Sequence, residues 1–493
     1  MPHSHTLLRN VTVLDGSGDP SMTVDVALAG DRIVQIGRGL AIDSERVIDC
    51  TGLALAPGFI DTHTHDDAAV IDKPAMLPKL SQGVTTVIVG NCGISCAPVE
   101  LRSAPPDPMN LLGGARAFRY PTFAAYVDAV REAEPAVNVA ALVGHTALRS
   151  NHMDRLDREA APGEIAAMRA QLEEALAHGA LGLSTGLAYR NAHAASTAEV
   201  LALAEPLAAA GGIYATHLRD ESDGVLEALE EAFRIGLDAR VPVIVSHLKC
   251  AGVANWGRAA EVLRALEEAC EGQPAGCDCY PYAAGSTTLD LRQVDARVEI
   301  TITWSDTHPE VAGLALAHIA EDWGVSQPEA ARRLQPAGAI YHSMDEKDMR
   351  RILAHPATMI GSDGLPNDPR PHPRLWGAFP RVLGLYCREE KLFGLEEAVR
   401  KMTSLSAERF GLEERGRIRE GYFADLVLFD PARIRDTASF DDPVRPAEGI
   451  EAVWVNGELA YTPEGATGNR AGRFLPRAAA QRTEPMQRVP AHD

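Results

Sequence analysis

The middle of the chain alternates short runs of apolar residues with longer amphipathic stretches. Runs that are apolar at every position predict strands buried on both faces, as in parallel sheets, and stretches such as 162–179 and 224–236 predict connecting helices. Eight such units predict an α/β fold, a (β/α)8 TIM barrel over residues 58–414. The predicted strands are Phe59–Asp61, Val84–Gly90, Val137–Val143, Leu181–Thr185, Ile213–Thr216, Val241–Ser246, Cys277–Tyr280 and Thr358–Gly361.

Both ends of the chain carry short strand patterns separated by turn residues, for example Val24–Leu28 and Ala424–Phe429. Neither end is large enough to form a good core by itself. We therefore predict one small β-sandwich-like domain assembled from residues 6–57 and 415–475. The polar segment 476–493 is predicted to be a loose tail unless it docks on the rest of the protein.

The connection between the seventh and eighth predicted strands, residues 281–357, is far longer than an ordinary crossover. Long insertions after barrel strands commonly cover the site at the strand ends. We therefore expect a lid within residues 281–357.

The chain has 493 residues, a formal net charge of −21 and an isoelectric point near 5.2. This balance argues against nucleic acid as the main partner, because a phosphate backbone calls for a basic face. The chain shows no signal-peptide pattern and no apolar run of the roughly 18–20 residues that a membrane span needs. Eight cysteines in so long a chain are not a disulfide framework. We expect a cytoplasmic protein, a monomer or small homo-oligomer, that acts on a small molecule and has no membrane partner.

Side chains that can bind a metal ion follow the predicted strands. His63 and His65 end the first strand, and they project together because alternate residues of a strand share a face. In a TIM barrel the carboxyl ends of the strands form one rim, where catalysis takes place. Later strands are followed by Cys92, His145, His217, His247 and Asp363. A metal-dependent hydrolase site is the simplest explanation of so many such residues at the strand ends.

Four motifs resemble those of the D-aminoacylases, the N-acyl-D-amino-acid deacylases of the amidohydrolase superfamily. They are Gly90–Pro98 (GNCGISCAP), Ala215–Ser222 (ATHLRDES), Tyr280–Thr287 (YPYAAGST) and Met359–Pro366 (MIGSDGLP). The resemblance covers almost the entire chain and implies a TIM barrel with a small β domain, in agreement with the strand pattern. It also implies hydrolysis of N-acyl-D-amino acids, and the preference for the D form rests on the resemblance alone.

The resemblance implies a tightly bound zinc ion, Zn2+, at Cys92, His217 and His247. A thiolate and two neutral imidazoles leave one coordination position open, as a catalytic zinc site requires. Many amidohydrolases bridge two metal ions with a carboxylated lysine at the end of the fourth strand, but Leu181–Thr185 contains no lysine. This departure fits the deacylase branch and argues against a fully occupied binuclear site.

By the same resemblance, His63, His65 and Asp363 are catalytic and form at most a weak second metal site, whose occupancy is optional. Zinc would lower the pKa of its bound water and polarise the amide carbonyl. Asp363 would accept the proton of the water and then deliver it to the departing nitrogen, which must leave as a neutral amine. The two histidines would orient Asp363 and the water.

An N-acyl amino acid carries a free α-carboxylate, so its pocket needs positive charge and hydrogen-bond donors. Among the candidates, Lys249 is the best placed, because it follows His247 by two positions on the same face of the predicted strand. The substrate-binding residues implied by the resemblance are Tyr189, Lys249, Tyr280, Ser286 and Arg374.

Two further residues keep two interpretations each. His145 either lines the pocket or caps the third strand, and Arg292 either reads the substrate side chain or pairs with the nearby Asp290.

Alternative functions also stay open at this point. The deacylase could select acidic D-residues, glutamate or aspartate, instead of hydrophobic ones. A cyclic-amide hydrolase resembling hydantoinases or dihydroorotases is a second reading, against which the missing lysine and the Cys92 motif count. A non-enzymatic relative that serves as an assembly scaffold is a third, but such proteins tend to lose metal ligands, and here the full set is present.

Overall fold

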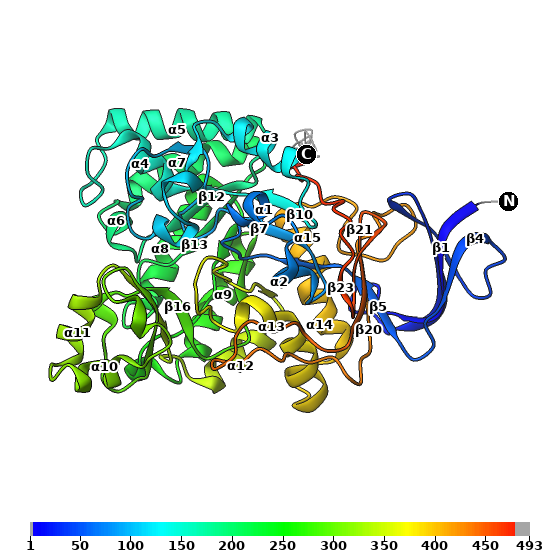
Figure 1. Cartoon of the computed structure of the whole chain (residues 1–493). Helices are drawn as coiled ribbons and strands as arrows, with labels where there is room; N and C mark the ends of the chain where they lie inside the picture. Colours follow the sequence, from blue (N-terminus) through cyan, green and yellow to red (C-terminus); the bar gives the residue numbers. More distant parts are fainter. Residues whose placement is uncertain (1–2, 479–493) are drawn as a thin grey trace, which may run out of the picture.

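The apolar runs of the middle region form parallel strands in the computed structural model, which describes residues 3–478 (Figure 1). These strands make two sheets, in the orders β10-β7-β6 and β11-β12-β13-β14-β15-β19. The segments that follow β6 and β19 are joined by a hydrogen bond from Asp363 N to His63 O (2.8 Å). The strands are β6 (Phe59–Asp61), β7 (Val84–Val89), β10 (Asn138–Ala141), β11 (Val143–Gly144), β12 (Gly182–Gly186), β13 (Ile213–His217), β14 (Val243–Val245), β15 (Ala275–Cys279) and β19 (Thr358–Ile360).

Every predicted strand of the middle region corresponds to an observed one, but the third, Val137–Val143, is broken at Leu142 into β10 and β11. The break lies where the backbone changes its partner, because β10 pairs with β7 and β11 pairs with β12. The predicted mixed α/β class is confirmed.

The strands are buried on both faces because their side chains alternate between two clusters. One cluster is shared by successive strands. The residues adjacent to its members along each strand, such as Phe59 beside Ile60 and Val87 beside Ile88, pack in the second cluster, which includes most of the helices. The shared cluster includes Ile60, Ile88, Ala140, Ile213, Ile244 and Met359.

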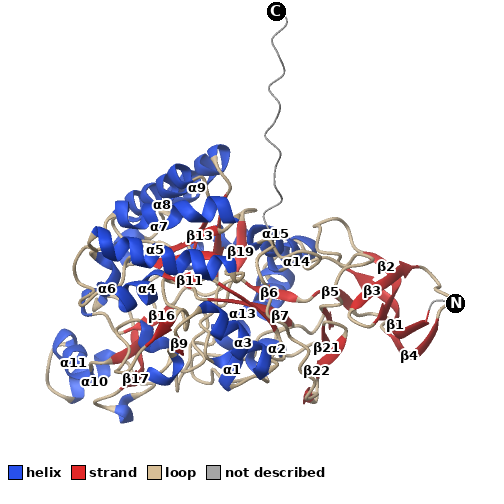
Figure 2. Cartoon of the chain, turned by 90° about the horizontal axis from the view of Figure 1, so that it is seen from above, coloured by secondary structure: helices blue, strands red, loops and turns tan. Residues whose placement is uncertain are grey.

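Amphipathic helices connect the strands. In α8, for example, Val225, Leu229 and Ala232 recur at helical spacing and are all buried. Helices α5, α7, α8 and α9 lie side by side along one side of the parallel strands (Figure 2). The main helices are α3 (Phe123–Ala133), α4 (His145–His152), α5 (Pro162–Ala177), α7 (Thr197–Ala210), α8 (Val225–Ala239), α9 (Ala259–Gly272), α12 (Glu346–Ala354), α13 (Arg374–Arg381), α14 (Leu395–Met402) and α15 (Ser404–Phe410).

Both ends of the chain contribute to one nine-stranded sheet, ordered β23-β22-β21-β20-β5-β1-β2-β3 with β4 paired to β1. Strands from the start and the end of the chain meet where β5 pairs with β20, and Figure 1 shows the blue and the orange-red strands next to one another. The strands are β1 (His3–Val13), β2 (Met22–Ala29), β3 (Arg32–Gly37), β4 (Asp43–Asp49), β5 (Ala54–Pro57), β20 (Leu426–Phe429), β21 (Ile450–Val455), β22 (Glu458–Thr462) and β23 (Gly465–Ala466).

The long connection between β15 and β19 folds into a unit of its own. Its three strands form an antiparallel sheet in the order β16-β18-β17, and a separate apolar cluster joins this sheet to two helices. The last helix of the connection, α12, packs against α9 and β19 instead. The inserted elements are β16 (Gly285–Thr288), β17 (Ile300–Ser305), α10 (Leu316–Asp322), α11 (Gln327–Leu334) and β18 (Ala337–Tyr341).

The predicted tail begins docked, because Arg477 N donates a hydrogen bond to Gly179 O (2.9 Å). The rest of that prediction, residues 479–493, lies outside the described residues. All eight cysteines lie within the described part and are free. Among residues 3–478, no helix is long and apolar enough to cross a membrane.

A buried polar network joins the nine-stranded sheet to β10. Its centre is Asp425, whose carboxylate accepts hydrogen bonds from Asn138 Nδ2 (3.1 Å) and Asn456 N (2.7 Å) and pairs with the guanidinium of Arg415. The Asn456 side chain also donates to Asn138 Oδ1 (2.8 Å). Because both charges are buried, each depends on the other for compensation.

We predict that Asp425→Ala lowers the free energy of unfolding by about 3–5 kcal/mol, because it leaves a buried guanidinium unpaired. Chemical denaturation measures the change. Glu458→Ala, which removes an exposed carboxylate on β22, is the matched control and should stay within about 0.5 kcal/mol of the parent. Equal effects of the two substitutions would contradict the prediction.

Candidate active site

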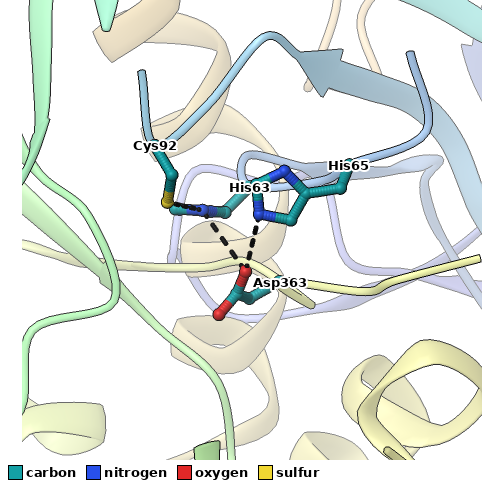
Figure 3. Close-up of side chains that lie close together, drawn as sticks. All are labelled: His63, His65, Cys92 and Asp363. Carbon is teal, nitrogen blue, oxygen red and sulfur yellow. Dashed lines mark hydrogen bonds and ion pairs between the residues drawn. The ribbon is translucent and has the colours of Figure 1, made fainter. Parts of the chain in front are cut away.

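Four metal-binding side chains converge beyond the ends of β6, β7 and β19. The candidate ligand atoms of His63, His65, Cys92 and Asp363 all lie within 4.8 Å of one another, and Figure 3 shows the four side chains pointing together. His65 Nε2 is 3.1 Å from Asp363 Oδ1, and His63 Nε2 is 3.1 Å from Cys92 Sγ. The structure therefore brings together residues that the sequence placed on three different strands.

A second group shares the thiol of Cys92 and adds His217 and His247, again with all ligand atoms within 4.8 Å. Burial alone would raise the pKa of the Cys92 thiol, but the charges of His63 and His247 and hydrogen bonds from His217 and His247 lower that pKa well below its usual value. The thiolate, which is the form that binds metal, is therefore favoured.

The chemistry of this second group fits zinc. A thiolate and two imidazoles are ligands that zinc prefers, and three protein ligands leave a position open. The Nδ1 atom of His217 is buried and has no hydrogen-bond partner among the described residues. A buried nitrogen in that state is unfavourable unless something binds it, as a metal ion would.

The backbone at these positions is strained. Cys92, His247 and Asp363 have φ angles of +55°, +36° and +48°, in the left-handed region that residues with a Cβ seldom adopt. Such conformations cost about 1–3 kcal/mol each and persist where the surroundings hold them. Glycine makes the close approach possible: a Cβ on Gly186 would lie 2.2 Å from Cys92 O.

Two carboxylates that the sequence analysis missed hold the histidines. Asp278, on β15, accepts a hydrogen bond from His247 N (2.9 Å) and lies 3.3 Å from His63 Nδ1. Glu221 lies 3.0 Å from His247 Nδ1 and 3.5 Å from His217 Nε2. Carboxylates in this position fix the orientation of ligand imidazoles. For Glu221 a signal existed, because it belongs to the same motif as His217 (ATHLRDES).

Asp363 is held on both sides. Its Oδ1 faces His65, and its Oδ2 lies 2.9 Å from a nitrogen of Arg374. Burial would raise the pKa of this carboxyl, but the Arg374 and His63 charges and the bond from His65 lower it well below its usual value. The ionised form of Asp363 is therefore favoured.

The predicted substrate-binding side chains surround the same centre. Arg374 donates to the backbone oxygen of Ser286 (2.9 Å), and its guanidinium lies 4.5 Å from the centre of the Tyr280 ring. Tyr189 packs on His217, with ring centres 4.8 Å apart. The hydroxyl of Ser286 is buried without a partner among the described residues.

Lys249 also lies at the centre, but not for the predicted reason. The strand β14 ends at Val245, so His247 and Lys249 do not share a strand face. The positive φ at His247 turns the chain, and Lys249 Nζ then lies 2.6 Å from both His247 Nδ1 and Glu221 Oε1.

His145 and Arg292, which the sequence left with two interpretations each, belong to neither metal-binding group. His145 begins α4, and its Nε2 lies 2.9 Å from Glu199 Oε1, which also pairs with Arg149. Arg292 bonds to both carboxylate oxygens of Asp290, as the ion-pair interpretation expected.

Comparison with known proteins agrees with this geometry. The model of the amidohydrolase family matches residues 46–461. The D-aminoacylase of Alcaligenes xylosoxydans xylosoxydans is 50% identical over 474 residues, which cover 96% of this chain and 98% of that protein.

Solved structures agree as well. A D-aminoacylase crystal structure matches with a TM-score of 0.94 and 50% identity, over 96% of this chain and 100% of the other. The N-acyl-D-glutamate deacylase of Bordetella bronchiseptica, solved with zinc and a phosphonate mimic of the tetrahedral intermediate, matches with a TM-score of 0.93 and 43% identity over 96% and 100% of the two chains. The chain therefore belongs to the amidohydrolase family, in its D-aminoacylase branch.

Proposed function

We propose that this protein hydrolyses the amide bond of N-acyl-D-amino acids to a carboxylate and a D-amino acid. The observation that carries the proposal is the position of the Asp363 carboxylate. It lies between His65 and Arg374, and one of its oxygens is within 4.8 Å of Cys92 Sγ, the atom shared by both metal-binding groups. A base, a Lewis-acid site and a cation are thereby available to one amide bond. The relatives named as deacylases support the same reaction.

Cys92, His217 and His247 would hold one zinc ion tightly, and His63, His65 and Asp363 would form a weaker, optional second site. Bound zinc supplies a water of lowered pKa and polarises the amide carbonyl. The chain offers no lysine on β12 to bridge two ions, which supports one tight site in place of two equal ones.

Asp363 would move the proton. It accepts a proton from the attacking water and delivers it to the nitrogen of the departing D-amino acid, so that the amine leaves neutral. The hydrogen bond from His65 to Oδ1 keeps one oxygen oriented, while the ion pair with Arg374 orients the other.

The α-carboxylate of the substrate would be bound by Arg374 and Lys249, with Tyr189, Tyr280 and Ser286 as further contacts. Arg374 is buried and the Lys249 side chain is only 11% exposed, and Arg374 has a planar guanidinium that can donate two parallel hydrogen bonds to a carboxylate. The unpartnered Ser286 hydroxyl supports its role as a donor.

The same proposal includes the architecture. We propose that the middle region, residues 58–414, is a closed (β/α)8 barrel, that the two ends (6–57 and 415–475) are a β-sandwich-like domain, and that the insertion within 281–357 serves as the lid. The two parallel sheets and the separate apolar clusters of the two ends and of the insertion support this proposal. The hydrogen bond between the segments after β6 and β19 supports closure. The free cysteines support a cytoplasmic location.

Among D-amino acids we propose apolar side chains as the preferred class, with acidic ones as the alternative. Arg292, the cation in the insertion that could attract an acidic side chain, is already paired with Asp290 at 2.6 Å. The similarity to an N-acyl-D-glutamate deacylase favours the alternative.

We predict about one zinc ion per chain and hydrolysis of N-acetyl-D-methionine in preference to N-acetyl-L-methionine. Metal analysis and an assay of amine release measure both, and a panel that includes N-acetyl-D-glutamate and N-acetyl-D-aspartate decides the side-chain class. No hydrolysis of any D-substrate by the zinc-loaded protein would refute the proposed function.

We predict that Asp363→Ala retains the tight zinc but lowers kcat by about 10²–10⁴-fold, the usual contribution of a general base. Zinc content and steady-state kinetics on the same preparation separate the two effects. Substantial residual turnover would show that another group is the base.

We predict that Arg374→Met raises KM about 10–100-fold, as expected from losing a charged hydrogen bond of about 1.5–3 kcal/mol. The KM for the α-amide of N-acetyl-D-methionine, which lacks the carboxylate, should change much less. If both substrates lose the same factor, Arg374 does not bind the carboxylate.

A further inference from the structure

A buried ion cluster made of Lys79, Asp61 and Asp66 lies next to the catalytic segments. Lys79 comes from the short helix α2 (Leu77–Leu80), and its side chain is fully buried. Its Nζ lies 2.8 Å from Asp61 Oδ2 and 3.1 Å from Asp66 Oδ2, and it donates to Ser362 Oγ at 2.9 Å. One ammonium group therefore contacts both the segment that carries His63 and His65 and the segment that carries Asp363.

The cluster also fixes the backbone of both segments. The second oxygen of Asp61, Oδ1, accepts hydrogen bonds from Ser362 N (2.8 Å) and His63 N (3.4 Å). The Ser362 hydroxyl, which Lys79 holds, accepts a third bond from Gly364 N (3.1 Å). Both chain neighbours of Asp363 are thus tied to the Lys79–Asp61 pair.

Asp363 needs this support because its backbone is strained. Its φ of +48° is unfavourable for a residue with a Cβ, so surrounding contacts must hold it. The catalytic contact depends on the same backbone, because His65 Nε2 and Asp363 Oδ1 meet at 3.1 Å across the two segments. A small shift between the segments would separate these atoms.

The residues that follow α2 also support the helix that carries Arg374. Gln82, three residues after Lys79, is buried; its Nε2 donates to Leu375 O (2.8 Å) and its Oε1 accepts from Phe379 N (3.3 Å). These contacts hold α13, which begins at Arg374. The segment from Lys79 to Gln82 therefore supports both partners of the Asp363–Arg374 ion pair.

Stability alone does not explain the cluster. Taking one ammonium and two carboxylates out of water is costly, and well-packed apolar residues are often at least as stable in such a place. A buried charge cluster of this kind instead holds its segments in fixed relative positions, because its hydrogen bonds are directional.

We infer that Lys79 is a positioning residue for the reaction: through Asp61 and Ser362 it sets the alignment of Asp363 with His63 and His65. The inference rests on the proposed hydrolysis for its kinetic effect, but the alignment itself is a property of the chain.

The test replaces Lys79 by Met, which keeps the apolar stem and removes the ammonium. Lys401→Met is the matched control, because Lys401 is also fully buried and donates to Thr358 O (3.3 Å) at the start of β19, the strand that leads to Ser362. We expect Lys79→Met to keep the parent's zinc content and KM but to lose about 10²-fold in kcat, the size of a small misplacement of reacting groups. Lys401→Met should keep kcat near the parent value even where its unfolding midpoint falls.

A crystal structure of Lys79→Met tests the alignment without any assay, and the distance from His65 Nε2 to Asp363 Oδ1 should exceed hydrogen-bonding range. If the single variant does not fold, the triple variant Lys79→Met, Asp61→Asn, Asp66→Asn leaves no carboxylate unpaired and is expected to show the same loss. An unchanged kcat and an unchanged distance would overturn the inference, as would an equal kcat loss in Lys401→Met. A parent protein without activity would refute the proposed function instead, and the crystal structure would still decide the alignment.

Discussion

The site depends on one contact, which we call the join: the hydrogen bonds between the segment after β6 and the segment after β19. His65 and Asp363 are 298 residues apart in sequence, yet their side chains meet at 3.1 Å. Two backbone hydrogen bonds hold the join, from Asp363 N to His63 O (2.8 Å) and from His65 N to Gly364 O (3.3 Å). A Cβ on Gly361 would lie 2.6 Å from His63 Cβ, so the two segments approach this closely only because that residue is glycine.

Cys92 belongs to both groups of metal-binding residues, so the two groups compete for its charge when metal ions bind. Its Sγ lies 3.1 Å from His63 Nε2 and 3.3 Å from His247 Nε2. One thiolate carries a single negative charge, so an ion held by it in one group weakens its attraction for an ion in the other. Since no lysine on β12 supplies a second bridging charge, the shared thiolate supports the proposal of one strong site in place of two equal ones.

Much of this arrangement could be predicted from the sequence, since strand patterns and strand-end residues are local signals. The eight strands and the residues His63, Cys92 and Asp363 were found because apolar runs end at them. Asp278 was missed because its role depends on which strand lies beside β15, and no spacing in one chain tells that. Lys249 lies next to His247, as predicted, but not on a shared strand face, since β14 ends at Val245 and the positive φ at His247 ends the alternation that the strand argument assumed.

The charges at the site are consistent with the proposed binding of an acidic substrate by an acidic protein. The chain has a net charge of −21, but the site holds two cations, the buried Arg374 and the largely enclosed Lys249. Each is paired with a carboxylate that also contacts a histidine: Asp363 for Arg374 and Glu221 for Lys249. Two such pairs are neutral overall, so the cations are compensated before any substrate arrives. In the proposed function, a substrate carboxylate would share these cations, which are already in place. Because hydrogen bonds to a buried guanidinium are directional, the proposed binding by Arg374 would depend on the correct placement of the substrate carboxylate more than on its charge alone.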